Sequence, residues 1–217
     1  MRNGEWRNAE TKAVAVSHSA FSIPHSAFAL RRRRIEPLSL IDFHNSTDLS
    51  GAKLQTMCVG ALNGWNVGGL IVRVRYSRGA DFSGTCIYVD RRIYINLGRH
   101  LVYPYGMRTN LAKVKTVGRG WQRPIYVVEF KTAYQLALFI FLHEIYHLLV
   151  YRAGRNTRQK ESMCDRFAAR YLVDHLGAAV RTERGERVPR EDWDFQDLDG
   201  FVTGRRVRRS ACAARRG

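Results

Sequence analysis

The longest apolar pattern in the chain spans residues 132–151 and predicts a helix that is buried on nearly every side. Thr132 followed by Gln135 is a capping-box pattern, which marks the start of a helix. The run contains no Gly or Pro and stops before Gly154, a residue suited to the left-handed position after a helix. Its longest stretch without a polar residue covers only residues 136–142, far short of the roughly 20 apolar residues of a membrane span. We therefore expect no membrane contact.

Shorter patterns predict an α+β domain around this helix. Alternating apolar and polar positions are typical of half-buried strands, whereas apolar residues three and four apart indicate helices. A second helix is predicted after the long one, capped by Asn156 or Thr157 and ended by Gly177. The other predicted elements are a strand at 40–43, a helix at 47–65, a strand at 70–76, a hairpin from 85–89 and 93–97, and a strand at 125–130.

The two ends of the chain differ from this middle part. Residues 18–28 contain a near-repeat, HSAFSIP followed by HSAF, which precedes a run of arginines. Low-complexity repeats seldom build a core, so residues 1–37 are predicted to be a disordered or non-native extension. Residues 38–180 are the predicted domain. Residues 181–217 are a predicted flexible tail, in which an acidic cluster precedes an arginine-rich end.

Charge and cysteine content say little about the function of the protein and only weakly favour particular partners and a compartment. The chain of 217 residues has a formal net charge of +17, spread over all its regions, which favours polyanion contact only in general terms. The four cysteines are scattered and form no CxxC pair, which argues against a disulfide framework and favours a reducing compartment. We therefore expect a cytoplasmic protein.

Three polar residues interrupt the apolar helix: His143, Glu144 and His147. Burying them costs free energy unless a partner such as a metal ion compensates them. The two histidines are four residues apart, so both project from one helix face and can hold one ion. This HExxH pattern is typical of Zn²⁺ bound by two imidazoles, with the glutamate as general base. The alternative is two core histidines that share this spacing by chance.

A catalytic zinc ion needs a third protein ligand, and the second predicted helix offers candidates. Glu161 and Asp165 are four residues apart on one face of that helix, with Cys164 beside them. Glu161 is the favoured ligand, and Asp165, His175 and Cys164 are its rivals. Alternatively, Glu161 is a solvated acid in the first turn of a helix, where acids are common.

HExxH followed by a helix carrying ExxxD resembles the gluzincins. The order of elements over 40–176, with IYINLG in the hairpin, resembles the compact minigluzincin and ImmA/IrrE-like zinc peptidases. The resemblance implies a small zincin-like fold in which Zn²⁺ is held by His143, His147 and Glu161. It implies that Asp165 supports a zinc-binding histidine. It also implies hydrolysis of peptide bonds in a peptide or protein substrate.

The chain departs from these families in two places. Tyr146 stands where ImmA/IrrE-like members often have Gly, and the segment 99–130 is longer than the link that compact members place before the catalytic helix. Tyr146 is expected to face away from the metal, so the chemistry should survive. The residue that stabilises the oxyanion stays open among four tyrosines: Tyr134, Tyr146, Tyr151 and Tyr171.

The segment 91–128 mixes basic and aromatic residues without any Asp or Glu, as expected where phosphates and bases are bound. A solvated basic loop is the alternative. Two further function classes therefore stay open, a nucleic-acid-associated regulator with a zincin fold and a structural zinc protein. Glu144 argues against a structural site, because closed coordination has no use for a base. The basic residues are Arg91, Arg92, Arg99, Arg108, Lys113, Lys115, Arg119 and Arg123; the aromatic ones are Tyr94, Tyr103, Tyr105, Trp121 and Tyr126.

Overall fold

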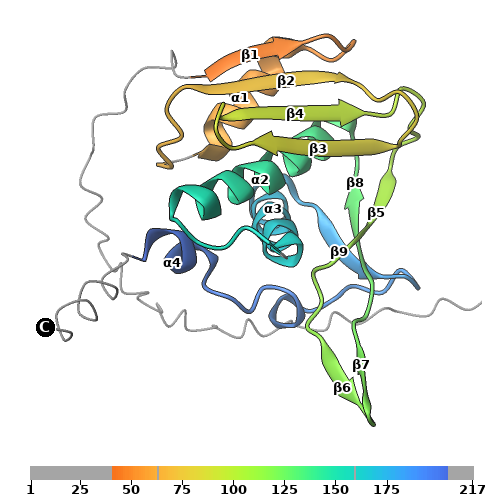
Figure 1. The fold of residues 1–217 in the computed structure, drawn as a ribbon. Coiled ribbons are helices and arrows are strands. Elements are labelled where there is room, and N and C mark those ends of the chain that lie inside the picture. Colours follow the sequence, from red (N-terminus) through yellow and green to blue (C-terminus); the bar gives the residue numbers. More distant parts are fainter. Residues whose placement is uncertain (1–40, 63, 159, 205–217) are drawn as a thin grey trace, which may run out of the picture. The chain divides into compact units, whose positions relative to one another are not determined.

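The computed structural model describes residues 41–62, 64–158 and 160–204, which form helices and several small sheets (Figure 1). The α+β class predicted from the sequence is confirmed. The predicted extension 1–37 and the arginine-rich end lie outside the described residues.

The first sheet has the strand order β1–β2–β4–β3. β1 (Ile41–Asn45), β2 (Leu70–Tyr76) and β4 (Arg92–Leu97) are parallel, and β3 (Phe82–Ile87) runs antiparallel to β4 at the edge. Alternate side chains of β2 are buried, as the sequence pattern predicted. The predicted hairpin is also confirmed. Arg91 adopts the left-handed conformation (φ 49°) that a Gly usually supplies in such a loop.

α1 (Gly51–Leu62) connects β1 to β2 and begins later than the predicted residue 47. The residues before it form local side-chain turns that compete with helix. The Thr47 N–H donates to Asn45 Oδ1 at 3.0 Å, and the Lys53 N–H donates to Ser50 Oγ at 3.3 Å. Ser50 therefore caps the helix, which starts at the next residue.

α2 (Ala133–Arg152) is the helix predicted at 132–151, and both of its ends form as expected. Thr132 Oγ1 accepts from the Gln135 N–H at 3.4 Å, while Gln135 Oε1 reaches back to the Lys131 N–H at 2.6 Å. After the last turn, Gly154 adopts a φ of 63°, and its N–H donates to a carbonyl of that turn at 2.8 Å.

Packing covers α2 on nearly all sides. Figure 1 shows it beneath the first sheet, with α1 and α3 (Glu161–Leu176) nearby. The helix is long and apolar enough to cross a membrane, but 83% of its most apolar window is buried inside the fold. Such burial is typical of the core helix of a soluble protein.

A second sheet has the order β5–β8–β9, with all its strands antiparallel. β8 (Tyr126–Phe130) is the strand predicted at 125–130. β5 (Tyr105–Thr109) and β9 (Ala179–Thr182) were not predicted, because neither shows a clear apolar alternation. This sheet brings the end of β5 close to α3.

A small hairpin, β6 (Lys115–Val117) and β7 (Gly120–Gln122), lies between β5 and β8. All of its residues are exposed, and it projects from the rest of the fold (Figure 1). Residues 113–123 are called the arm below. The arm contributes no side chain to the core, since each of its residues is exposed.

α3 ends at Gly177 as predicted, with φ 62°. Its start differs from the prediction: neither Asn156 nor Thr157 caps it, and the first helical residue is Glu161. The Asn156 side chain instead accepts from the N–H two residues further on, at 2.9 Å, and so stabilises a local turn. The later start places Glu161 at the helix N-terminus, beside α2.

The prediction that the domain ends at 180 is wrong. Residues 183–204 form a 3₁₀ turn (Arg190–Asp192) and α4 (Leu198–Thr203), and pack against the same core. Trp193 is 2% exposed and Leu198 is fully buried. The Tyr146 hydroxyl on α2 donates to the Leu198 carbonyl at 3.0 Å, so Tyr146 faces this segment.

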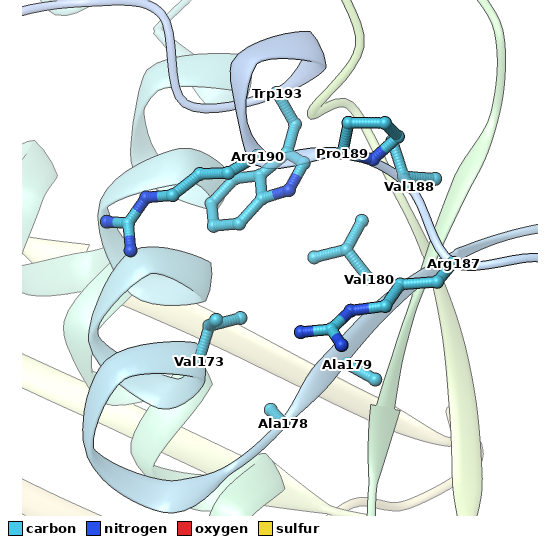
Figure 2. Close-up of a pocket in the computed structure, with 9 residues that line it drawn as sticks. All are labelled: Val173, Ala178, Ala179, Val180, Arg187, Val188, Pro189, Arg190 and Trp193. Atoms are coloured by element: carbon cyan, nitrogen blue, oxygen red, sulfur yellow. The ribbon is translucent and has the colours of Figure 1, made fainter. Parts of the chain in front are cut away.

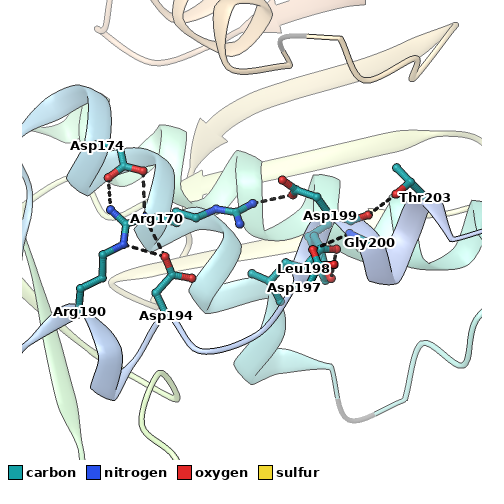
Figure 3. Close-up of polar contacts among 10 residues, drawn as sticks. Arg170, Asp174, Arg190, Asp194, Asp197, Leu198, Asp199, Gly200 and Thr203 are labelled. Carbon is teal, nitrogen blue, oxygen red and sulfur yellow. Dashed lines mark hydrogen bonds and ion pairs between the residues drawn. The ribbon is translucent and has the colours of Figure 1, made fainter. Parts of the chain in front are cut away.

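Two residues of the acidic cluster, Asp194 and Asp199, form ion pairs although the sequence pattern predicted a solvated tail (Figure 3). Arg190 binds Asp174 on α3 at 3.1 Å and Asp194 at 2.7 Å. Arg170 on α3 binds Asp199 at 2.6 Å. These charges fasten the segment to α3, which the spacing of charges along one chain could not reveal.

Candidate metal centre

Two histidines from α2 and one glutamate from α3 converge. The Glu161 carboxylate oxygens lie 3.1 Å from His143 Nε2 and 3.3 Å from His147 Nε2. The Glu161 side chain is 60% exposed, whereas both imidazoles are largely buried. Two imidazole nitrogens and one carboxylate are the donor set of many catalytic zinc sites, so the residues fit that ion.

Asp165 supports one of these histidines. Its Oδ1 lies 2.9 Å from His143 Nδ1, and its Oδ2 accepts from the Asn110 N–H at 2.8 Å. Because an ionised carboxylate only accepts, the His143 Nδ1 carries the proton and its Nε2 is left to bind a cation. The second bond ties the loop after β5 to α3.

Neighbouring charges and burial keep two of the three donors, His147 and Glu161, in the protonation state that binds a metal ion. Burial disfavours the charged form of His143, but hydrogen bonds to Asp165 and Glu161 outweigh it and raise its pKa to about 10. Burial and the charge of His143 lower the pKa of His147, and the hydrogen bond to His143 lowers the pKa of Glu161. His147 is therefore neutral and Glu161 ionised, whereas His143 must release a proton when it binds a metal ion.

Glu144 lies against the edge strand β3. A Cβ placed on Gly84 would stand 2.2 Å from Glu144 Oε1, so a glycine is required for the carboxylate to occupy this position. Burial raises the pKa of Glu144 to about 7, although His143 opposes the shift. A carboxyl group with such a pKa can accept and return a proton near neutral pH. Gly84 lies just before the strand predicted at 85–89 but inside the observed β3, where a Gly is typical of a close approach by another group.

Cys164 is a second candidate for the third donor. One ligand atom from each of His143, His147 and Cys164 lies within 4.8 Å of the others. The thiol is fully buried, and its burial, with the charges of nearby carboxylates, raises its pKa far above the ordinary value. The Glu161 oxygens lie within 3.3 Å of both imidazoles and are ionised, whereas the thiol resists ionisation, so Glu161 is the favoured donor.

His175, the other rival ligand, is remote from the histidine pair. It stands 14 residues after Glu161 on α3, which is about 21 Å along the helix axis. Its exposed ring packs on Tyr171 with centroids 4.4 Å apart. The prediction that His175 competes for the metal is therefore ruled out.

A cavity of about 290 Å³ opens beside the cluster. No tyrosine lines it among the described residues, so none of the four tyrosines considered as oxyanion donors reaches the site. Two side-chain donors that the sequence did not single out for this role do reach it, Arg108 and Asn110, because β5 carries them to the cluster. The complete lining is Phe82, Gly84, Met107, Arg108, Asn110, Phe139, Ile140, His143, Glu144, Glu161 and Asp165.

The basic residues of 91–128 are dispersed over the fold. Arg99 stacks on Tyr76, Arg108 pairs with Glu183, and Lys113 donates to a backbone carbonyl. Among the described residues no ion-pair partner contacts the other basic side chains of the arm, and the arm also exposes Trp121 at 79%. The surface suited to phosphates and bases, which was predicted over 91–128, is therefore confined to the arm. The unpaired side chains are Lys115, Arg119 and Arg123.

Comparison of the chain with protein-family models, with curated proteins and with solved structures finds no match. The structure therefore establishes only the α+β class of the fold. A function has to be inferred from the geometry of His143, His147 and Glu161 and of the cavity beside them.

Proposed function

We propose that this protein is a zinc-dependent metallopeptidase with a zincin-like fold. The observation that carries the proposal is the convergence of His143, His147 and Glu161 beside a cavity that also contains Glu144. Three protein donors leave a coordination position for water, as in catalytic zinc sites. A purely structural site has no need of a buried glutamate at its side.

Each residue has a defined role in this proposal. His143, His147 and Glu161 hold the ion, and Asp165 fixes the ring of His143. When bound, Zn²⁺ lowers the pKa of a coordinated water and polarises a carbonyl oxygen. Glu144 would accept a proton from the attacking water and return it to the leaving amine, as a general base and then a general acid beside the site.

The edge of the first sheet supports a peptide or protein as the substrate. β3 is the last strand of that sheet, and its residues Phe82 and Gly84 line the cavity. An extended peptide can pair with such an edge and so lie beside Glu144. Apolar Phe139 and Ile140 in the same cavity favour an apolar substrate side chain. The described cysteines are free thiols, which agrees with the proposed cytoplasmic location.

Removal of the metal tests this function. Purified full-length protein is expected to contain about one zinc ion per chain and to cleave members of a peptide library. Treatment with a chelator should abolish cleavage, and zinc, but not magnesium, should restore it, because imidazole ligands favour zinc over a hard cation. Cleavage that persists after complete metal removal would contradict the proposal.

The arm supports a second candidate function, binding of single-stranded nucleic acid. Lys115, Arg119 and Arg123 can each meet a phosphate, and the exposed Trp121 ring can stack on a base. The arm begins three residues after Asn110, which lines the cavity, so a polyanion bound at the base of the arm would lie near the cavity. A nucleic-acid-associated regulator built on this fold would use this surface.

Replacing Lys115, Arg119 and Arg123 with Ala is expected to reduce the salt dependence of oligonucleotide binding. The log–log slope should fall by ~0.7 for each phosphate that is no longer neutralised, because fewer counterions are released. A variant with Arg78, Lys131 and Arg158 replaced removes the same charge from exposed sites elsewhere and serves as the control. Fluorescence anisotropy at several salt concentrations measures both. Equal slopes for the two variants would rule out the arm as the binding surface.

A further inference from the structure

A second cavity, of about 430 Å³, lies beside the C-terminal part of α3, at the opposite end of the helix from Glu161 (Figure 2). Its size falls within the range of small-molecule sites, roughly 300–1,000 Å³. It is formed by the C-terminal half of α3, by β9 and by the segment that follows. Its lining residues are Val173, Ala178, Ala179, Val180, Arg187, Val188, Pro189, Arg190 and Trp193.

The frame of this cavity is held by hydrogen bonds and ion pairs. The Val188 N–H donates to the Val180 carbonyl at 3.0 Å, which closes the loop between them. On the opposite side, Arg190 is fixed by Asp174 and Asp194 (Figure 3). These bonds hold the cavity open without a ligand. Its interior surface is apolar and is formed by Val180, Val188 and the buried Trp193.

The two arginines of the cavity differ in what they can bind. Arg190 is neutralised by two carboxylates, and Figure 2 shows its guanidinium pointing away from the other lining residues. Arg187 forms no ion pair with any described residue, and its side chain reaches toward Val173 and Ala179. One uncompensated guanidinium beside apolar walls suits a ligand with a single anionic group and an apolar body.

We propose that this cavity binds a carboxylate that carries an apolar body. The Arg187 guanidinium receives the carboxylate, whose two oxygens match the planar fork of N–H donors. The apolar body packs on Val173, Val180 and Val188. Such a carboxylate is either a free aliphatic acid or the C-terminus of a peptide that ends in an apolar residue. The site is separate from the metal centre and does not depend on the proposed peptidase activity.

Titration calorimetry of the full-length protein tests this site with three probes: octanoate, N-acetyl-Leu-Leu and 1-octanol. At least one of the two carboxylates should bind, and 1-octanol should bind at least about 10-fold more weakly than octanoate, because a charge-assisted hydrogen bond contributes more than about 1.4 kcal/mol. Binding of octanoate alone identifies a free acid as the ligand class. Binding of the dipeptide alone identifies a peptide C-terminus, and binding of both identifies the shared chemistry.

Variants on either side of the cavity complete the test. Arg187→Gln should weaken carboxylate binding at least about 10-fold. Arg184→Gln, an exposed arginine of the same loop that does not line the cavity, should leave it unchanged. Ala179→Phe should fill the hollow and weaken both probes, with the melting temperature recorded to confirm folding. Failure of both carboxylates to bind at millimolar concentration, or equal affinities of the two arginine variants, would overturn the proposal.

Discussion

Replacing Glu144 with Gln is expected to lower kcat by about 10²–10⁴-fold, because the amide cannot take a proton from water. Zinc content should stay at the wild-type level, since Glu144 is not one of the three proposed ligands. Peptide cleavage and elemental analysis of the same preparation measure both effects. The matched control is Glu129→Gln on β8, which removes a carboxylate that does not line the cavity. Full activity of Glu144→Gln would remove this residue from the mechanism.

The contact between Gly84 and Glu144 offers an independent route to the same carboxylate. In Gly84→Ala the new methyl group would stand 2.2 Å from Oε1, so the Glu144 side chain must move. Activity should therefore fall while the zinc content is retained. Gly79→Ala, whose Cβ would meet no atom within 4 Å, is the matched control. If Gly84→Ala retains wild-type kcat, the observed position of Glu144 is not the one used in catalysis.

Replacing Glu161 with Ala is expected to cost more zinc affinity than the roughly 10–100-fold expected for Asp165→Asn, because a ligand rather than its support is removed. Cys164→Ala should retain the metal, since burial and nearby carboxylates raise the pKa of its thiol and so disfavour the thiolate that would bind the ion. His175→Ala is the control, because that residue lies at the far end of α3. Competition with a chromogenic chelator gives the affinities.

The other outcomes of this series have distinct meanings. Loss of zinc from Cys164→Ala but not from Glu161→Ala would make the thiolate the third ligand. Loss of zinc from both would indicate four protein donors and a closed coordination shell. That second outcome would favour a structural zinc protein and contradict the proposed hydrolysis.

Local sequence signals predicted the central helix well. Thr132, Gln135 and Gly154 act on groups within a few residues, so their capping roles are fixed before the chain folds. The alternation of β2 likewise reflects a strand with one face on the core. The start of α3 was missed because the local turn at Asn156 competes with a helix that would otherwise begin there.

Charge patterns were a poorer guide. The acidic residues after 190 and the arginines of α3 are far apart in sequence, and each set alone is typical of solvated surface. Pairs such as Arg170–Asp199 form only because the segment after β9 packs against α3. Folding has the opposite effect on the basic residues of 91–128: charges that lie close together in the sequence are spread over different parts of the fold.

The sequence by itself determined that His143 and His147 share one helix face next to Glu144, because helical periodicity fixes the relation between residues three and four apart. The tertiary structure decided which further residues join them. Packing of α3 on α2 brings Glu161 and Cys164 to the histidines and leaves His175 remote, while the edge strand brings Gly84 against Glu144. Such contacts join segments that local patterns treat separately, and only the burial of their shared apolar surface sets the distance between them.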